Sequence, residues 1–203
     1  GRNRRRSFFS ALALGMGMAL LLLLAAILEG EMRGALETSL KLQSGHLQVR
    51  ASSYNENKNS LAWEDLIENP FELAAKIQTL DLVKEATPRL YAAGIVVVGE
   101  DTIGVRIVGI DPLAQANAPY REGLVNGEFL LPDDRDGILI GQSLADKIRV
   151  RVGDRLTLLV NTSNGDVDQQ AFTIRGTYST KIPTYDQTTV LMALSKAQAI
   201  TRT

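Results

Sequence analysis

The apolar stretch from Phe8 to Leu28, which contains no charged residue, limits what the protein can be more than any other feature. It includes an unbroken leucine run, Leu20 to Leu24, and its only hydroxyl side chain is Ser10. A helix rises about 1.5 Å per residue, so the stretch matches the roughly 30 Å hydrocarbon core of a bilayer. The sequence therefore predicts one membrane-spanning helix near the N-terminal end.

Charged residues on either side of the span predict its orientation. Glu29 and Glu31 follow it, and four arginines precede it: Arg2, Arg4, Arg5 and Arg6. The positive-inside rule places the arginine end in the cytoplasm, so we expect the rest of the chain in the periplasm, anchored to a bacterial inner membrane. A cleaved signal peptide is the alternative. Its apolar region is shorter, about 7–15 residues, and Leu28-Glu29-Gly30 is a poor cleavage site, so a retained anchor is favoured.

Small residues recur within the span at four-residue spacing. Ala11, Gly15 and Ala19 form one stripe, with Ala13 and Gly17 alongside. Small side chains let helix backbones approach closely in lipid, where packing drives association. The pattern indicates partner helices, although Gly and Ala are also common in spans without such contacts.

The helical pattern continues past the membrane span. Met32, Leu36 and Leu40 extend an apolar stripe, and Gly45 is typical of a helix end. We expect a rigid stalk that couples the membrane helix to a globular domain.

Strand-like and helix-like segments alternate through the rest of the chain, so the fold class is α+β, a mixed α/β domain with antiparallel hairpins. Turn residues predict hairpin tips at 99–102 and 161–166. Asn69-Pro70 predicts a helix start, and 111–126 is expected to be loop. The helix after Pro70 should bury Leu73, Ile77 and Leu80. The expected strands are His46–Arg50, Val83–Leu90, Ile95–Val98, Ile103–Ile110, Ile138–Ile140, Leu156–Val160, Phe172–Gly176 and Thr188–Met192; further helices are expected at Gln142–Ile148 and Ser195–Ile200.

Domain boundaries follow from this pattern. Residues 1–44 hold the basic end, the membrane helix and the stalk, and residues 45–203 hold the periplasmic core domain. Residues 113–176 could form a smaller β-rich subdomain inserted in it. Because the chain begins with Gly1 and stops at Thr203 after an apolar-patterned segment, we interpret it as a fragment that lacks further membrane helices.

Composition excludes several kinds of site. Removing the four N-terminal arginines from the net charge of −1 leaves −5, which argues against a nucleic-acid groove. The chain has no cysteine, and His46 is its one histidine. Disulfides, thiolate chemistry, histidine triads and histidine-pair metal sites are therefore excluded. No glycine is followed by lysine, so there is no P-loop for ATP. We predict no catalytic, cofactor or metal site.

Three short patterns have simpler interpretations. Asp133 to Gly137 is acidic but lacks the alternating oxygen ligands and distal Glu of an EF-hand, so a solvated turn is favoured. Asn161-Thr162-Ser163 matches a glycosylation tripeptide, which occurs often by chance. Tyr178 and Tyr185, around Lys181-Ile182-Pro183, could form either a contact loop or a packed turn.

Several segments together make the chain similar to a known family. In order and spacing they resemble bacterial ABC transporter permeases of the lipoprotein-releasing and macrolide-exporter type, which are MacB-like or FtsX-like. The matching segments are Arg4–Phe9, Ser44–Val49, Val108–Pro112, Asp136–Gly141, Val152–Leu158, Phe172–Gly176 and Pro183–Asp186.

The resemblance implies more than the residue pattern does. Such permeases place a large periplasmic domain between their first and second membrane helices and carry three more helices at the C-terminus. They act as homo- or heterodimers with an ATP-binding cassette subunit, which holds ATP and magnesium. Movement of the stalk helices is relayed to a periplasmic substrate.

We therefore expect a permease subunit, not an enzyme, that serves lipoprotein release from the inner membrane. An efflux-type permease remains an alternative within the family. A single-span anchored binding or scaffolding module without an ATPase is one alternative outside it. A membrane-anchored enzyme is another; the sequence disfavours it because it has no cysteine and no paired-carboxylate motif, but Asp or Glu pairs assembled in space stay open.

Overall fold

The computed structural model describes residues 3–39, 47–54 and 61–203, with side chains omitted for 35–39. The chain divides into two units, Gly1–Gln43 and Ser44–Thr203. Helix α1 (Arg4–Ser39) lies in the first unit and is a single helix of 36 residues. At about 1.5 Å per residue it is about 54 Å long, well beyond the roughly 30 Å of a bilayer core.

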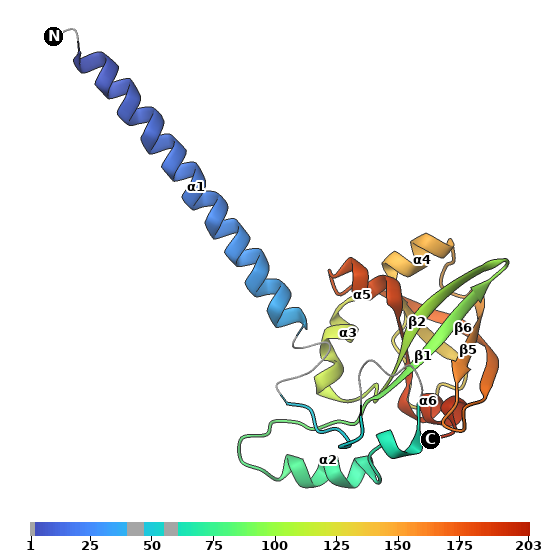
Figure 1. The fold of residues 1–203 in the computed structure, drawn as a ribbon. Helices are drawn as coiled ribbons and strands as arrows, with labels where there is room; N and C mark the ends of the chain where they lie inside the picture. Colours follow the sequence, from blue (N-terminus) through green and yellow to red (C-terminus); the bar gives the residue numbers. More distant parts are fainter. Residues whose placement is uncertain (1–2, 40–46, 55–60) are drawn as a thin grey trace. The chain divides into compact units, whose positions relative to one another are not determined.

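The second unit combines strands and short helices (Figure 1). Its strands are β1 (Leu90–Val98), β2 (Asp101–Ile110), β3 (Leu124–Gly127), β4 (Gly137–Gly141), β5 (Arg155–Asn161), β6 (Val167–Tyr178) and β7 (Thr189–Ala193). Its helices are η2 (Trp63–Asp65), α2 (Pro70–Gln78), η3 (Gln115–Asn117), α3 (Ala118–Glu122), α4 (Gln142–Ile148), α5 (Pro183–Thr188) and α6 (Leu194–Thr201).

All seven strands belong to one mixed sheet in the order β3-β6-β4-β7-β2-β1-β5. The hairpins β1–β2 and β5–β6 are antiparallel, whereas β2–β7 and β4–β6 are parallel. Strand β6 also pairs with β5, which closes six of the strands into a barrel. The closure works because β6 is long: its first half pairs with β5, and its second half pairs with β4 and β3. Residues 113–176 contribute β3 to β6, and these strands pair with one another and with β1 and β7.

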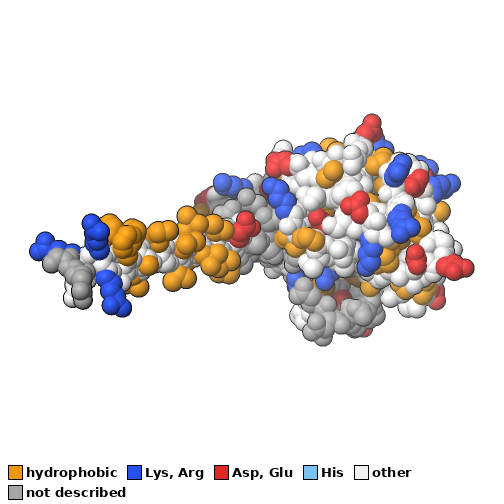
Figure 2. Space-filling view, turned by 90° about the horizontal axis from the view of Figure 1, so that it is seen from above, with side chains coloured by type: hydrophobic (Ala, Val, Ile, Leu, Met, Phe, Trp, Pro, Cys, Tyr) orange, Lys and Arg blue, Asp and Glu red, His pale blue; other side chains and the backbone are white. Residues whose placement is uncertain are grey.

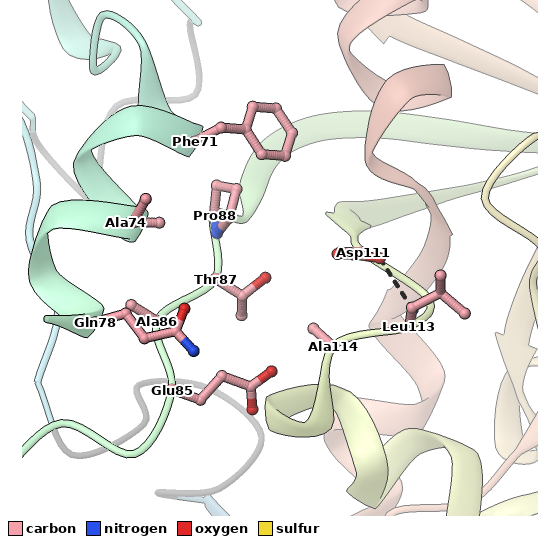
Figure 3. Close-up of a pocket in the computed structure, with 11 residues that line it drawn as sticks. Phe71, Ala74, Gln78, Glu85, Ala86, Thr87, Pro88, Asp111, Leu113 and Ala114 are labelled. Atoms are coloured by element: carbon pink, nitrogen blue, oxygen red, sulfur yellow. Dashed lines mark hydrogen bonds between the residues drawn. The ribbon is translucent and has the colours of Figure 1, made fainter.

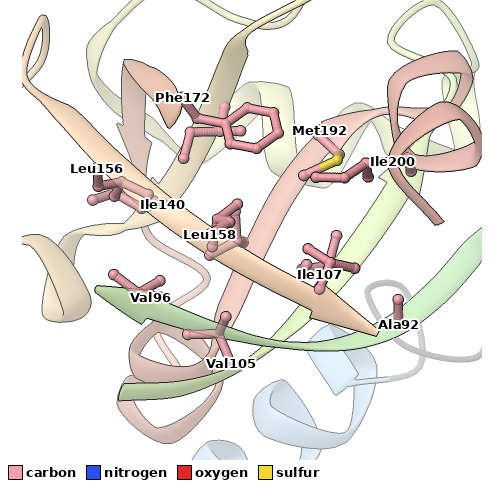
Figure 4. Close-up of a cluster of buried hydrophobic side chains, with 14 of the residues drawn as sticks. Ala92, Val96, Val105, Ile107, Ile140, Leu156, Leu158, Phe172, Met192 and Ile200 are labelled. Carbon is pink, nitrogen blue, oxygen red and sulfur yellow. The ribbon is translucent and has the colours of Figure 1, made fainter. Parts of the chain in front are cut away.

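The hydrophobic core fills the inside of this barrel (Figure 4). Strand residues alternate between the two faces of a sheet, so every second residue of β1, β2, β5 and β6 points inward. Leu158, Phe172 and Ile107 are among the fully buried side chains. Helices α4 and α6 contribute to the same cluster, and in Figure 1 they lie on opposite sides of the strands.

The C-terminal half of the domain agrees closely with the sequence prediction. Both hairpins form, with tips at 99–100 and 162–166, and α4 has the predicted bounds Gln142–Ile148. Strands β4 and β7 and helix α6 also lie where they were predicted, to within one or two residues.

The N-terminal half of the domain differs from the prediction. Residues 47–50 and 83–89 form no strand, and β1 begins only at Leu90; His46 lies outside the described residues. A strand needs a hydrogen-bonded neighbour, and no described strand pairs with either segment. The predicted loop 111–126 instead holds η3, α3 and most of β3.

Helix α2 starts at Pro70 as predicted, but two details differ. Asn69 precedes it in a left-handed conformation, with φ 50°, and makes no side-chain capping hydrogen bond. The predicted buried stripe is not buried: Leu73 and Ile77 are half-buried, and Leu80 is 59% exposed. No other described helix or strand covers this face. The apolar spacing therefore predicted the helix correctly but not its burial.

Candidate functional site

Helix α1 has the length and composition of a membrane-spanning segment. The qualifying stretch is Arg4–Gly34, and none of it is buried within the described structure. Figure 2 shows apolar side chains along the helix, beyond the arginines at its start. In water such a surface would be unstable, because a contiguous apolar patch of this size favours burial in lipid or protein. The helix therefore has the surface expected of a membrane-spanning segment.

The small residues of α1 occupy two faces, not one. Successive residues of a helix are turned by about 100°, so Ala11, Gly15 and Ala19 lie within about 80° of one another. Ala13 and Gly17 lie on the opposite side, about 180° away, which corrects the prediction that they lie alongside. A Cβ added to Gly15 or Gly17 would meet nothing within 4 Å. Packing of either face against a neighbouring helix stays a prediction.

The stalk residues fall on the later part of α1. Met32 is 64% exposed, and Leu36 is in the helix, although its side chain is not described. Leu40 and Gly45 lie outside the described residues. Arg33 and Glu29 form an ion pair at 2.6 Å one turn apart, which adds a few tenths of a kcal/mol to the helix at most.

Two arginines hold the segment between β2 and α3 in place. Arg89 donates to the carbonyl of Ala116 and to Oδ1 of the fully buried Asn117. Arg121 donates to the carbonyl of Pro112 at 2.6 Å. These hydrogen bonds hold in place the short helical segment that begins at Gln115, which was predicted to be loop. Such scattered contacts leave no periodic pattern, so sequence reasoning missed them.

Tyr178 and Tyr185 are buried in a packed turn, which decides between the two predicted alternatives. Together with Tyr120 they form a cluster in which the Tyr120 and Tyr185 hydroxyls share a hydrogen bond. Burial raises the pKa of Tyr120 and Tyr178 well above the usual tyrosine value, and burial also raises the pKa of Tyr185. The cluster is a structural support for the domain.

The turn that holds these tyrosines is fixed by a buried carboxylate. Asp186 is 1% exposed. It accepts hydrogen bonds from the Thr180 hydroxyl at 2.7 Å, the Thr180 backbone N–H at 3.1 Å and the Ser179 hydroxyl at 3.1 Å. Lys181, which lies inside the turn, adopts a left-handed conformation with φ 64°. The carboxylate is thus fully occupied by its own loop and is not placed for chemistry.

The acidic turn 133–137 is also structural. Asp134 accepts hydrogen bonds from the Leu131 backbone N–H and from Arg175, which also pairs with Glu128 at 2.8 Å. No cluster of potential metal ligands occurs among the described residues. The tripeptide that begins at Asn161 runs from the end of β5 into the hairpin turn, where Thr162 and Ser163 are buried.

A shallow pocket lies beside α2 (Figure 3). It has a volume of about 310 Å³ and is lined by residues of α2, by the segment 85–88 and by Asp111, Leu113 and Ala114. The Thr87 hydroxyl has no hydrogen-bond partner among the described residues. The carboxylates of Glu85 and Asp111 each already accept a backbone N–H, from Gln115 and Leu113. The described lining contains no histidine or cysteine.

Comparison with known proteins identifies the family. A family model described as the MacB-like periplasmic core domain matches residues 7–203. No protein with a curated description matches the sequence. Among solved structures, the periplasmic region of MacB from Actinobacillus actinomycetemcomitans is 20% identical with a TM-score of 0.46, and the match covers 68% of this chain and 61% of that one.

A second similar structure is the extracellular domain of the noncanonic ABC-type transporter YknZ from Gram-positive bacteria, at 11% identity and a TM-score of 0.49. That match covers 65% of this chain and 66% of the other, so the chain spans about two thirds or less of each solved domain. The family model, in contrast, extends over nearly the whole chain, α1 included. The chain belongs to the MacB-like periplasmic core domain family of ABC-transporter-type permeases.

Proposed function

We propose that this chain is the first membrane helix and the periplasmic domain of a permease subunit that releases lipoproteins from a bacterial inner membrane. Its arginine-rich end lies in the cytoplasm and its domain in the periplasm. An ATP-binding cassette subunit supplies ATP and magnesium, and a second permease, identical or related, completes the transporter. Cytoplasmic ATP hydrolysis is coupled through α1 to movement of the substrate.

The observation that carries this proposal is the continuity of α1. The helix runs from Arg4 to Ser39 without a break. About twenty residues suffice to cross the bilayer, so more than a dozen remain to carry motion beyond it. A continuous helix is stiff along its axis, whereas a flexible linker of the same length would absorb a displacement. The chain itself has no P-loop, so the energy must come from a partner.

Coupling requires an element that has two arrangements and that the nucleotide state biases. The two open faces of small residues fit this requirement, because a helix packed through small side chains can slide or rotate against its neighbours. Charge supports the orientation: arginines precede the span, and Glu29 and Glu31 follow it.

The test interrupts the stalk. We would insert seven Gly and Ser residues after Glu37 of the full-length protein, purify the complex and reconstitute it in proteoliposomes. ATP hydrolysis should persist while release of a labelled lipoprotein falls at least tenfold. The matched control is an insertion of seven Ala, Glu and Lys residues, which adds about two helical turns and keeps the helix almost in register; it should preserve most of the release.

Each outcome distinguishes the proposals. Undiminished lipoprotein release with the Gly-Ser insertion would show that α1 does not transmit the motion. Release of a small drug but not of a lipoprotein would assign an efflux-type permease. If no ATP-binding subunit co-purifies with the full-length protein, the single-span scaffolding module takes the place of the transporter.

A further inference from the structure

The start of α1 carries a dense group of positive charges. Arg4, Arg5 and Arg6 form its first turn, and Arg2 precedes them in the sequence. No acidic residue occurs among residues 1–28, and none of the three helical arginines forms an ion pair with another described residue. Figure 2 shows basic side chains gathered at this end of the helix, ahead of the apolar ones. The start of α1 therefore presents cations that no acid of the described structure neutralises.

Two phenylalanines lie one helical turn after two of these arginines. Residues four apart on a helix are turned by only about 40°, so Phe8 lies on the same side as Arg4, and Phe9 lies on the same side as Arg5. The two exposed rings contact each other edge to face, with their centroids 5.9 Å apart. The four side chains line a shallow hollow of about 490 Å³ on the surface of the helix. We call this surface the arginine–phenylalanine hollow.

The arginine–phenylalanine hollow lies where the membrane span begins. The apolar stretch starts at Phe8, and four residues advance a helix by about 6 Å, so the arginines are attached about 6 Å outside the two rings. Arginines near the end of a span keep the charged group at the boundary between water and lipid, while the carbon stem lies along the apolar surface. We therefore expect the guanidinium groups at the depth of the lipid phosphates and the rings beside the acyl chains.

We propose that the arginine–phenylalanine hollow binds an anionic phospholipid of the leaflet that surrounds the start of α1. A guanidinium group donates two parallel hydrogen bonds to a phosphate, and an anionic lipid carries the net negative charge that the arginines lack nearby. Four or more basic residues next to a membrane helix are typical of binding to such lipids. The inference rests on α1 spanning the membrane and not on the substrate that the permease moves.

The composition of the hollow favours a lipid over other anions. Free phosphate offers the same charged group, but it has no acyl chain to cover the exposed rings. The acidic surface of a protein partner also offers negative charge, but Phe8 and Phe9 belong to the apolar stretch that the bilayer surrounds. A phospholipid supplies a phosphate and an apolar chain in the same order along the helix axis as the arginines and the rings.

The hollow also separates a lipid site from the general effect of charge on topology. The positive-inside rule counts basic residues and does not distinguish one arginine of the first turn from another. Arg6 is turned by about 100° from Arg5, and it does not line the hollow. A lipid held in the hollow should therefore depend on Arg5 much more than on Arg6, whereas a diffuse attraction should depend on both equally.

The test labels the lipid beside the start of α1 in the full-length protein. The protein is placed in nanodiscs that contain a photoactivatable phosphatidylglycerol, which is anionic, or a photoactivatable phosphatidylethanolamine, which is zwitterionic. After irradiation, cyanogen bromide cleavage after Met16 isolates the start of the helix, and mass spectrometry measures the lipid adduct on it. Both leaflets of a nanodisc have the same composition, so the result does not depend on the orientation of α1.

Phosphatidylglycerol should label this segment several times more strongly than phosphatidylethanolamine. Arg5→Gln should lower the phosphatidylglycerol adduct about fivefold, which is the effect of one basic residue near an anionic surface. Arg6→Gln is the matched control: it removes the same charge from the same turn but outside the hollow, and should lower the adduct far less. Phe8→Ala with Phe9→Ala keeps every charge and should also lower the adduct, because the apolar part of the hollow is lost.

Four results would overturn the inference. They are equal labelling by the two lipids, equal loss of adduct in Arg5→Gln and Arg6→Gln, displacement of the adduct by inorganic phosphate at constant ionic strength, and crosslinking of a photoactivatable amino acid at Asn3 to another protein subunit in place of lipid. Circular dichroism of each variant confirms that the fold is intact. Lipoprotein release plays no part in these measurements, so this inference stands or falls separately from the proposed transport function.

Discussion

Gly141 occupies a position where no other residue fits. A Cβ built there would lie 1.9 Å from the backbone carbonyl oxygen of Asp186, which belongs to α5. Both partners are backbone, so neither can rotate away. Gly141→Ala should therefore lower the free energy of unfolding by about 3 kcal/mol, the upper end of the cost of overpacking. Chemical denaturation measures this change.

The matched control is Gly104→Ala, also in a strand, where the added Cβ meets nothing within 4 Å. It should alter the free energy of unfolding by less than about 0.5 kcal/mol. Equal effects at Gly104 and Gly141 would contradict the steric argument. Sequence alone could not separate these two glycines, because their difference arises from a contact between segments 45 residues apart.

The buried tyrosines give the domain a pH limit on the alkaline side. Burial raises the pKa of Tyr120, Tyr178 and Tyr185, so the folded protein keeps these protons at a pH where the unfolded chain has lost them. Their contribution to stability is complete below about pH 10 and is lost as the pH rises above it. Unfolding should therefore become easier above pH 10, and less so in Tyr185→Phe.

Tyrosinate absorbance follows the ionisation of the tyrosines, and far-ultraviolet circular dichroism follows the loss of helices and strands in the same titration. Of the five tyrosines, the three in the cluster should ionise only as the helices and strands unfold. Reversible ionisation of all five with the circular dichroism unchanged would refute the prediction. At Tyr178 and Tyr185 the sequence left a contact loop and a packed turn both open. It did not indicate the third member, Tyr120, which lies in the segment 111–126 that was predicted to be loop.

At the scale of elements, sequence reasoning succeeded where the partner of each strand is close in the chain. The hairpins β1–β2 and β5–β6 are joined by short turns, so alternation and turn residues were enough to predict them. It failed at 47–50 and 83–89, where apolar residues suggested strands but no described strand pairs with them. Alternation indicates that a segment can form a strand; only a neighbour with free hydrogen-bonding groups makes it one.

The two faces of small residues on α1 lead to a prediction about assembly. If each face packs against a different helix, Gly15→Leu and Gly17→Leu should each weaken association of the full-length protein in the membrane, and their effects should add, because the two positions then share no partner. Fluorescence energy transfer between labelled subunits measures the association. Leu21→Ile keeps the bulk of the side chain and serves as the control. An effect of Gly15→Leu alone would assign contact to one face only.

At the scale of the whole molecule, closure of the barrel decides how the domain unfolds. Strand β6 pairs with β5, β4 and β3, and β5 also pairs with β1. The sequence alone allowed residues 113–176 to be a separate subdomain, because it does not show these pairings. Long-range pairing of this kind is invisible in a local pattern, because parallel neighbours such as β2 and β7 are far apart in the chain.

The consequence is a single unfolding transition for residues 44–203, since one buried cluster inside the barrel contains residues from within 113–176 and from both sides of it. Leu158→Ala lies within 113–176, and Ile107→Ala lies outside it; both side chains are at most 1% exposed. Each substitution should lower the free energy of unfolding by about 2–5 kcal/mol, and each should shift the whole transition when calorimetry follows it. If residues 113–176 folded by themselves, Ile107→Ala would produce two unfolding transitions, and the transition of 113–176 would keep its midpoint temperature. One substitution lies inside residues 113–176 and the other outside them. If both shift the same single transition, the segment and the rest of the barrel unfold together.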